Sequence, residues 1–595
     1  MAVLVAAIIG MIALAIAPKY WFYFDVTPKV VVLLGGTAIA LIAGGGRFRL
    51  RSRFSWLLFG SAASLVLSAA FSTNRALSWF GGNWRRFGVV EQSAILLLAW
   101  LVALHAAGRP NRVRIILRGV AAAALAAGIY GILQYFGRDP LLPAAAYHVG
   151  EGIWAIVRPP GTLGYVSYFA NWLAMAAFLS LALAQMEERP LLRYGASAAA
   201  AAATCAMVLT GTRGALLASV AGCAALVFGR AWHPTRRSLT VAAVLGVAAI
   251  AFYVSPAGWN LHSRVRWFRE DPRGGARLEL WRDSLAMSIH RLPTGFGPEV
   301  FTAQFPHYES KQLAESYPDF AHESPHNMFL DALVSGGFPG LAILAALCAL
   351  ALARAPSAWL RSALVTGIVA QQFTVFTIPT AVMFYVAMAL CAGEVEQSLP
   401  MGARYRAQRL AAACAACILL YFAFRFAAAD RSLELARRSI QQNSGMAAAQ
   451  FYSAFERWRL PGAGSDLWYS RAMAVLAQRA PNKLQRIQIA AQAGYAALRA
   501  TRTAEDPFNA WYNAAALYAS ANDTVYAERS LRAAIAAHPN WFKPHWMLAR
   551  VLLLEGRSEE ARREAEHAVE LDAGKHKEVA ETLQYNATRL SAKQK

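Results

Sequence analysis

The sequence predicts an all-α fold in which a polytopic helical membrane domain is followed by a C-terminal α-solenoid. Of the 595 residues, 57% are hydrophobic and 16% are charged, whereas a soluble globular chain averages about 45–50% apolar and about 25% charged residues. The apolar residues form runs of about 20, the length that crosses a bilayer as a helix. These runs lie within residues 1–430, and residues 431–595 contain none.

The membrane domain, residues 1–430, contains about 12 to 13 apolar runs of spanning length. The first lacks a basic leader and a small-residue cleavage site, so we interpret it as a span and not as a removable signal peptide. The predicted spans are residues 2–17, 30–46, 55–71, 89–107, 115–136, 166–185, 195–211, 214–230, 239–255, 326–353, 357–375, 380–395 and 408–428.

Every second connection between these spans is rich in arginine. Because positively charged connections stay in the cytoplasm, we expect the N-terminus inside, and the long connection 256–325 and the tail 431–595 outside. The arginines that set this orientation are Arg47, Arg49, Arg51, Arg53, Arg109, Arg112, Arg114, Arg118, Arg230, Arg236, Arg237, Arg354, Arg361, Arg404, Arg406 and Arg409.

Two outer connections also carry arginine, against the orientation bias. Residues 72–88 contain Arg85 and Arg86, and residues 137–165 contain Arg158. An anionic substrate would explain them, and chance is the alternative for any single residue. The net charge of +23 does not predict a nucleic-acid partner, because many of the basic residues lie in short loops between apolar runs and no recognition motif is present.

The tail contains an internal repeat. Residues 507–540 and 541–574 align at a period of about 34, the period of a tetratricopeptide repeat (TPR). Small residues such as Ala515 and Ala527 let two helices approach closely, while Tyr518 fills the space between them. Since one such repeat cannot bury its apolar face alone, we expect several to stack into a solenoid. Such solenoids usually bind proteins, so a protein partner is a candidate ligand of the tail.

One motif in the outer connection resembles a zinc-protease signature. Residues 322–326 read His-Glu-Ser-Pro-His, but Pro325 would interrupt the single helix that this signature requires. We therefore predict no metal site, with Ser324 as the N-cap and Pro325 as the first residue of the next spanning helix. The six cysteines all fall within apolar runs and predict neither a disulfide framework nor a metal site.

His326 is then expected in the first turn of a spanning helix at the outer membrane face, next to Asn327. A helix N-terminus lowers the pKa of a nearby histidine, and a neutral imidazole can take a proton from a hydroxyl. The plainer alternative is a surface histidine near the headgroups. The same outer connection supplies the basic residues Arg264, Arg266, Arg269, Arg273 and Arg277.

Two arginines are candidate anion-binding residues. Arg213 begins a span, where facing lipid would be costly, and a guanidinium holds phosphate oxygens in a fork. Arg277 begins a stretch in which Leu278, Trp281 and Leu285 share a helical face, which predicts an interfacial amphipathic helix. A salt bridge with a nearby carboxylate is the alternative for Arg277. Together these residues predict a cationic site for an anionic, membrane-embedded substrate.

Several ordered motifs between residues 70 and 395 resemble those of bacterial O-antigen ligases and O-antigen polymerase-type proteins. They are Ser324-Pro325-His326-Asn327-Met328-Phe329-Leu330 with Gly336-Gly337-Phe338-Pro339-Gly340-Leu341, Thr212-Arg213-Gly214-Ala215, Arg277 and Trp281 with Pro293, Gly295 and Gly297, and Gly161-Thr162-Leu163-Gly164 with Tyr168-Phe169-Ala170-Asn171. The chain departs from the family at Tyr165, Val166 and Ser167, where Asn-Pro-Asn is common, which weakens a donor-sugar role for this loop.

The resemblance implies a metal-independent membrane glycosyltransferase of the GT-C kind, without a cofactor, in the bacterial cytoplasmic (inner) membrane. It implies an undecaprenyl-diphosphate glycan as donor and a hydroxyl of lipid A–core oligosaccharide as acceptor, on the periplasmic face. His326 would be the general base, and Arg213 and Arg277 would hold the diphosphate. Arg85, Arg86, Arg158 and Asn327 are candidate substrate contacts.

Three other functions remain open from the sequence. A polymerase would extend the glycan on its own lipid carrier, and a protein O-oligosaccharyltransferase would move it to Ser or Thr of a polypeptide presented by the tail. A transporter or scaffold without catalysis is the alternative from another class. Transporters usually place charges near the midplane between internal repeats, whereas the notable charges here cluster at the outer face.

Overall fold

The protein is described here from a computed structural model, which covers residues 1–44, 52–149, 156–229, 236–259, 261–262, 275–393, 403–462 and 464–593. Within these residues the chain is mostly helical, with one short antiparallel pair of strands, β1 (His148–Val149) and β2 (Ile156–Val157). Several arginines named above lie outside the described residues, namely Arg47, Arg49, Arg51, Arg230, Arg264, Arg266, Arg269 and Arg273.

Each predicted span coincides with an apolar helix. Seven of these helices are long and apolar enough to cross a membrane, judged by length and composition within the described residues. The prediction of a polytopic helical membrane protein is therefore confirmed. The helices are α1 (Ala2–Leu14), α2 (Thr27–Ala43), α3 (Arg53–Ala70), α5 (Val89–Ala106), α6 (Pro110–Tyr135), α7 (Val166–Met186), α8 (Pro190–Leu209), α9 (Arg213–Phe228), α10 (Arg236–Val254), α15 (Met328–Arg354), α16 (Ala358–Ala370), α17 (Ile378–Ala392) and α18 (Ala403–Gln441).

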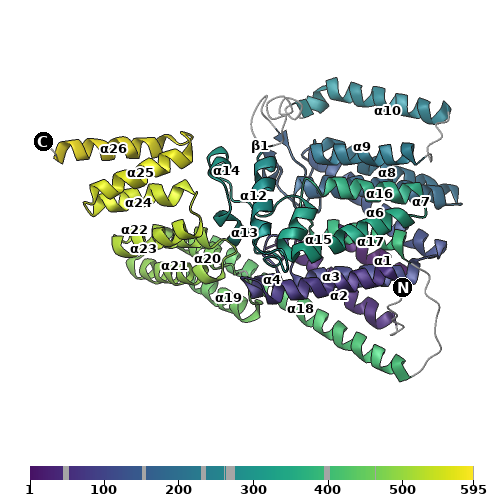
Figure 1. Cartoon of the computed structure of the whole chain (residues 1–595), viewed down its shortest axis with the longest axis horizontal. Coiled ribbons are helices and arrows are strands. Elements are labelled where there is room, and N and C mark those ends of the chain that lie inside the picture. The colour runs from purple at the N-terminus through teal and green to yellow at the C-terminus, as the bar shows by residue number, and fades with distance from the viewer. Residues whose placement is uncertain are drawn as a thin grey trace.

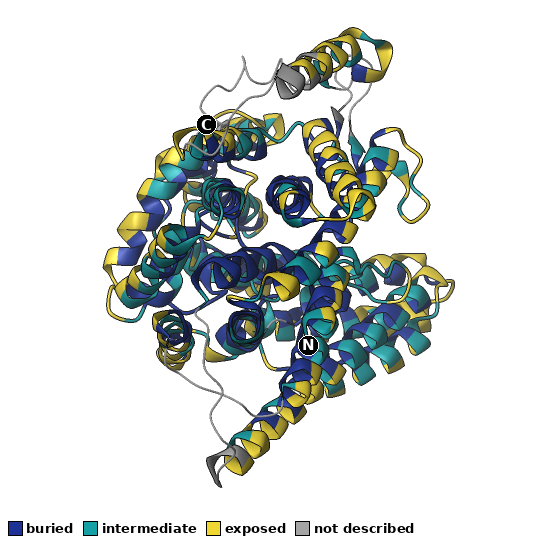
Figure 2. Cartoon of the chain, turned by 90° about the vertical axis from the view of Figure 1, so that its right-hand side faces the viewer, coloured by how far each residue is buried: buried dark blue, intermediate teal, exposed yellow. Residues whose placement is uncertain are grey.

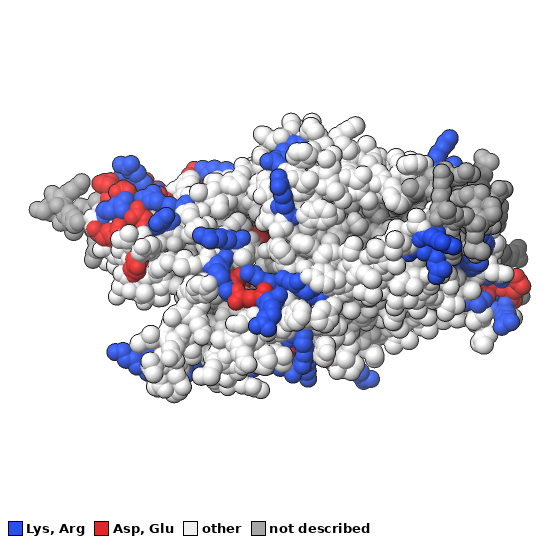
Figure 3. Space-filling model, turned by 90° about the horizontal axis from the view of Figure 1, so that it is seen from below, with Lys and Arg blue, Asp and Glu red and all other residues white. Residues whose placement is uncertain are grey.

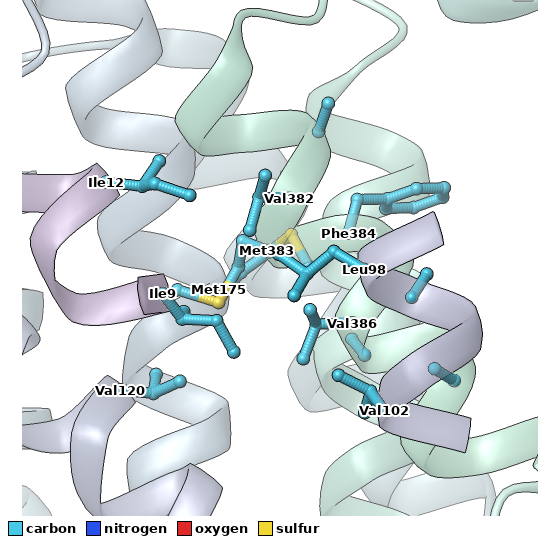
Figure 4. Packing of buried hydrophobic residues seen from close by; sticks show 14 of the residues in the cluster. Ile9, Ile12, Leu98, Val102, Val120, Met175, Val382, Met383, Phe384 and Val386 are labelled. Atoms are coloured by element: carbon cyan, nitrogen blue, oxygen red, sulfur yellow. The ribbon is translucent and has the colours of Figure 1, made fainter. Parts of the chain in front are cut away.

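The centre of the bundle is formed by α5, α7 and α17. The most apolar stretch of α7 is 83% buried and that of α5 is 72% buried, whereas that of α3 is only 28% buried. Figure 2 shows buried segments gathered in the interior and exposed ones on the outside of the molecule. Figure 4 shows residues of α17, among them Met383, packed between Leu98 of α5, Ile9 of α1 and Met175 of α7. Helices that are apolar on all sides pack in the interior, and the exposed apolar faces of the outer helices suit contact with lipid.

Charged side chains are unevenly distributed along the long axis. Figure 3 shows a largely uncharged surface between a band of Lys and Arg in the middle of the view and a second group at the right-hand end. An uncharged belt between two charged zones is the pattern that a bilayer imposes on its protein.

The tail is a series of helices, each packed on the next: α19 (Gly445–Trp458), α20 (Asp466–Arg479), α21 (Lys483–Thr503), α22 (Pro507–Ser520), α23 (Thr524–Ala537), α24 (Phe542–Leu554), α25 (Ser558–Asp572) and α26 (Lys577–Lys593) (Figure 1). The small residues Ala515 and Ala527 are fully buried between paired helices. α18 continues from the membrane domain into the tail, so residue 430 lies within a helix. Membership of the TPR class stays a prediction.

The long outer connection folds between the membrane helices and the tail. It contains α12 (Arg277–Ile289), α13 (Phe301–Gln304), η4 (Phe305–His307) and α14 (Lys311–Ser316) (Figure 1). Lys543 of the tail pairs with Asp319 of this connection at 2.8 Å, and Asn540 donates to the carbonyl of Glu309 at 2.7 Å. The connection and the tail therefore lie on the same side of the membrane domain.

The span predicted over 326–353 is not one continuous helix. α15 is broken at Gly337, whose φ of +65° lies in the left-handed region, and Pro339 follows. The break frees the carbonyls of Val334 and Ser335, which accept hydrogen bonds from the amides of Phe296 (2.8 Å) and Gly297 (3.0 Å). The outer connection is thereby bonded, main chain to main chain, to the helix that follows His326.

Candidate functional site

His326 lies just before α15, and the predicted cap is wrong by three residues. The N-cap is Asn327, whose Oδ1 accepts from the amides of Phe329 (3.0 Å) and Leu330 (3.2 Å). His326 has a left-handed φ of +51°, and its amide donates to Ser324 Oγ at 3.3 Å. An asparagine is a strong N-cap, so the helix starts after it. His326 is thus held outside the helix, in an uncommon conformation for a non-glycine residue.

His326 borders a cavity of about 390 Å³ that is built from five separate segments of the chain. The segment that precedes His326 contributes Phe320, His322 and Glu323. The other walls come from the start of α2, the connection before α5, the loop before α7 and the start of α17. The lining residues from those walls are Asp25, Val26, Lys29, Trp84, Arg85, Leu163, Gly164, Tyr165, Tyr168, Thr377, Ile378 and Pro379.

The environment of His326 favours its neutral form. The pKa of the imidazole is lowered to about 4, chiefly by burial and in addition by the nearby Arg277, His322 and Arg85. Nδ1 lies 3.4 Å from Ser324 Oγ. The predicted direction of the shift agrees with this finding, but the main cause is burial and not the helix N-terminus. A neutral imidazole beside a cavity has a nitrogen available to accept a proton.

Arg277 lies close enough to His326 to lower its pKa, and its helix is joined to the same loop. Trp281, one turn further along α12, donates its indole N–H to the carbonyl of Pro325 at 3.0 Å. Leu278 and Leu285 of the same helix are exposed, and its interfacial location stays a prediction. An indole N–H that is taken out of water needs an acceptor, and Pro325 supplies it.

Arg213 begins a helix whose next residue lies beside Phe373. It is the first residue of α9, and a Cβ at the neighbouring Gly214 would lie 3.1 Å from Phe373. The ring of Phe373 lies 6.4 Å from the ring of Trp281, which in turn holds Pro325. Phe373 therefore lies between the start of α9 and Trp281 of α12, and neither Arg213 nor Arg277 lines the cavity.

Arg85 faces the cavity, but its charge is already paired. Its Nε lies 2.5 Å from Glu299, and Nη1 lies 3.7 Å from Asp331. The guanidinium stacks 4.7 Å above the ring of Trp84, and its pKa is raised by the neighbouring carboxylates. Arg85 thus has an evident structural role in linking three segments at the wall of the cavity.

The remaining candidate contacts lie further from the cavity. Arg86 bonds Asn83 and lies 5.0 Å above the ring of Phe426 in α18, so it faces away from the cavity. Arg158 lies behind Tyr165, whose hydroxyl accepts from it at 3.4 Å. Asn327 caps α15. Neither Arg86, Arg158 nor Asn327 lines the cavity.

The sequence did not predict the cavity wall that Asp25, Val26 and Lys29 form at the start of α2. Asp25 and Lys29 lie one turn apart at the start of α2, and Lys29 Nζ donates to the carbonyls of Ala15 (2.8 Å) and Asp25 (2.5 Å). Burial raises the pKa of Asp25. A lysine that is buried at the edge of an apolar run is costly, so its presence there was the available signal. Gly164 packs against Asp25, where any Cβ would collide with the carboxylate.

The zinc-protease motif is not arranged as that class requires. The stretch 317–327, all of which is described, contains no helix, so His322 and His326 do not share a helical face. His322 instead faces Glu309, with 3.8 Å between Nε2 and Oε1, and its pKa is lowered by burial.

Comparison with known proteins gives one family match. Residues 198–345 match the family model described as O-antigen ligase. The matched range contains Arg213, Arg277 and His326, and it ends within α15. No curated protein and no solved structure matches the chain. The match confirms the family resemblance of the motifs between residues 212 and 341, whereas the element at residues 161–171 lies outside the matched range.

Proposed function

We propose that this protein transfers a glycan from undecaprenyl diphosphate to a hydroxyl acceptor, with lipid A–core oligosaccharide as the acceptor. The observation that carries the proposal is the convergence of His326 and Arg277 beside a cavity, within a segment of the O-antigen ligase family. The family supports a transferase in general, and the donor and acceptor follow from the resemblance.

His326 serves as the general base in this proposal. The acceptor hydroxyl enters from the cavity and gives its proton to the imidazole as its oxygen attacks the anomeric carbon of the donor glycan. Because Ser324 Oγ lies next to Nδ1, Nε2 is the nitrogen assigned to receive the proton. A new bond forms between the acceptor oxygen and the anomeric carbon, and the bond from that carbon to the diphosphate oxygen breaks.

Arg213 and Arg277 bind the leaving group. Polyprenyl diphosphate leaves with one more negative charge than it carried in the donor, and a guanidinium placed where that charge develops stabilises the transition state. Both arginines begin their helices, so the positive ends of two helix dipoles add to their charge. The protonated His326 then releases its proton to solvent.

The cavity has the chemical character of an acceptor site. The two cations that line it already have partners, because Lys29 donates to two main-chain carbonyls and Arg85 pairs with Glu299. Its aromatic residues offer faces on which the C–H surface of a sugar ring can stack, and its carboxylates accept hydrogen bonds from hydroxyls. These features favour a neutral polyhydroxyl group over a second phosphate.

An acceptor panel tests the function. Purified protein is incubated with labelled undecaprenyl-diphosphate glycan and one of three acceptors: lipid A–core, further lipid-linked glycan, or a Ser/Thr-rich secreted protein. We expect label on lipid A–core alone. Label on lipid-linked glycan would show a polymerase, and label on the polypeptide a protein O-oligosaccharyltransferase. Transfer to none of the three by folded protein would contradict a transferase of these substrates.

A further inference from the structure

The tail is bonded to the segment that forms one wall of the cavity. Glu309 precedes this wall, and its Oε2 lies 2.6 Å from Nε2 of His538, at the end of α23. Both side chains are buried, with 4% and 6% of their surface exposed. Asn540 donates to the carbonyl of the same glutamate at 2.7 Å. His538 thus holds the buried carboxylate of Glu309 and Asn540 holds its main-chain carbonyl, so two tail residues fix this position of the chain.

The same wall is held again near its other end. Asp319 pairs with Lys543 at 2.8 Å and with His576 at 3.1 Å, and the next residue, Phe320, lines the cavity. Because Asp319 is half exposed, these pairs are weak individually. The buried bond between Glu309 and His538 is the stronger of the two attachments.

Glu309 also connects the tail to a residue of the cavity itself. Its second carboxylate oxygen lies 3.8 Å from Nε2 of His322, and His322 lines the cavity four residues before His326. On the tail side, the ring of His538 packs against the ring of Phe508, with 4.9 Å between the ring centroids. A continuous path of packed and bonded groups thus runs from the tail to the cavity wall.

We propose that the tail braces the wall of the acceptor cavity, and that Glu309 and His538 are positioning residues for transfer. The role in transfer rests on the proposed function, whereas the bracing of the wall does not. Since a misplacement of about 1 Å can reduce an enzymatic rate about a hundredfold, loosening this wall should impair use of the acceptor. Donor binding should be spared, because Arg213 and Arg277 lie outside the wall.

Three full-length variants test the brace. His538→Ala removes the bond to Glu309, and His538→Gln replaces it, since the Gln amide can donate from a similar position. Arg562→Gln is the matched control, because it breaks an exposed pair with Glu566 on the same tail, away from the cavity wall. The measurements are kcat/KM for the acceptor, donor affinity, and hydrogen exchange of residues 305–323.

We expect His538→Ala to lower acceptor kcat/KM about tenfold or more, to keep donor affinity, and to speed exchange in 305–323. His538→Gln should restore most of the acceptor kcat/KM and most of the protection from exchange in 305–323. Arg562→Gln should match the wild type in all three measurements. If residues 305–323 of His538→Ala exchange hydrogen at the wild-type rate, the tail does not brace the wall. If His538→Ala loses donor affinity and acceptor kcat/KM to the same extent, Glu309 and His538 do not position the wall for the acceptor. If the wild type transfers to no acceptor, the proposed function fails, while the exchange comparison still decides whether the tail braces the wall.

Discussion

His326 combines an uncommon backbone conformation with an environment that favours a neutral ring. Its φ of +51° is of a kind that persists only where the surrounding structure holds it, and here Ser324 and the cap at Asn327 do so. Burial and the nearby Arg277 lower the pKa of the ring to about 4. The imidazole is therefore neutral near pH 7.

The pH profile of transfer follows from that shift. A lowered pKa means that His326 becomes protonated only when the pH falls towards about 4, so acceptor kcat/KM should show no loss attributable to this residue between pH 6 and 8. The profile of the free enzyme reports the pKa of its essential base. A fall in acceptor kcat/KM on the acid side with its midpoint near the ordinary histidine pKa of about 6.5 would contradict a lowered pKa for His326.

Arg213 is expected to act through the geometry of its guanidinium and not through charge alone. Arg213→Lys keeps the charge but loses the fork that holds two phosphate oxygens, so we expect the KM for the donor to rise about tenfold, or about 1.4 kcal/mol. Arg193→Lys is a suitable control, since Arg193 is an exposed arginine in the first turn of α8 and does not line the cavity. Unchanged donor affinity in Arg213→Lys would remove Arg213 from the diphosphate site.

At the scale of elements, the break in α15 joins the outer connection to the helix that follows His326. Gly337 is required there, because a Cβ would lie 2.4 Å from the carbonyl of Leu292 and the φ is positive. We expect Gly337→Ala to destabilise the protein by about 1–3 kcal/mol, measured as a lower Tm in detergent. Gly195→Ala, in open space on α8, should leave Tm unchanged or raise it slightly.

The helices could be predicted from sequence because each corresponds to a continuous apolar run, and seven of them, within the described residues, have the length and composition of a span. The residue-level errors arose where packing overrides such patterns. Asn327 was a better cap than Ser324, although both are capping residue types. The Gly-Gly-x-Pro-Gly run at 336–340 signalled a break in α15 that the hydropathy of the run concealed. The cavity could not be predicted, because its five segments are far apart in sequence.

At the scale of the whole molecule, the tail and the outer connection share one side, and the N-terminus lies at the opposite end (Figure 1). The arginine-rich connections predict that this opposite end is cytoplasmic. A reporter that is active only in the cytoplasm should therefore be active when fused near Arg112, and inactive when fused after residue 593. The reverse pattern would overturn the orientation, and with it a site on the periplasmic face.

The most direct test of the mechanism is transfer by His326→Ala, with the donor bound beforehand so that binding and chemistry are separated. His290→Ala is the matched control, because His290 is an exposed histidine at the end of α12. We expect His326→Ala to bind the donor like the wild type and to lose transfer by about a hundredfold or more, while His290→Ala transfers normally. Normal transfer by inserted, donor-bound His326→Ala would contradict the assignment of His326 as the base.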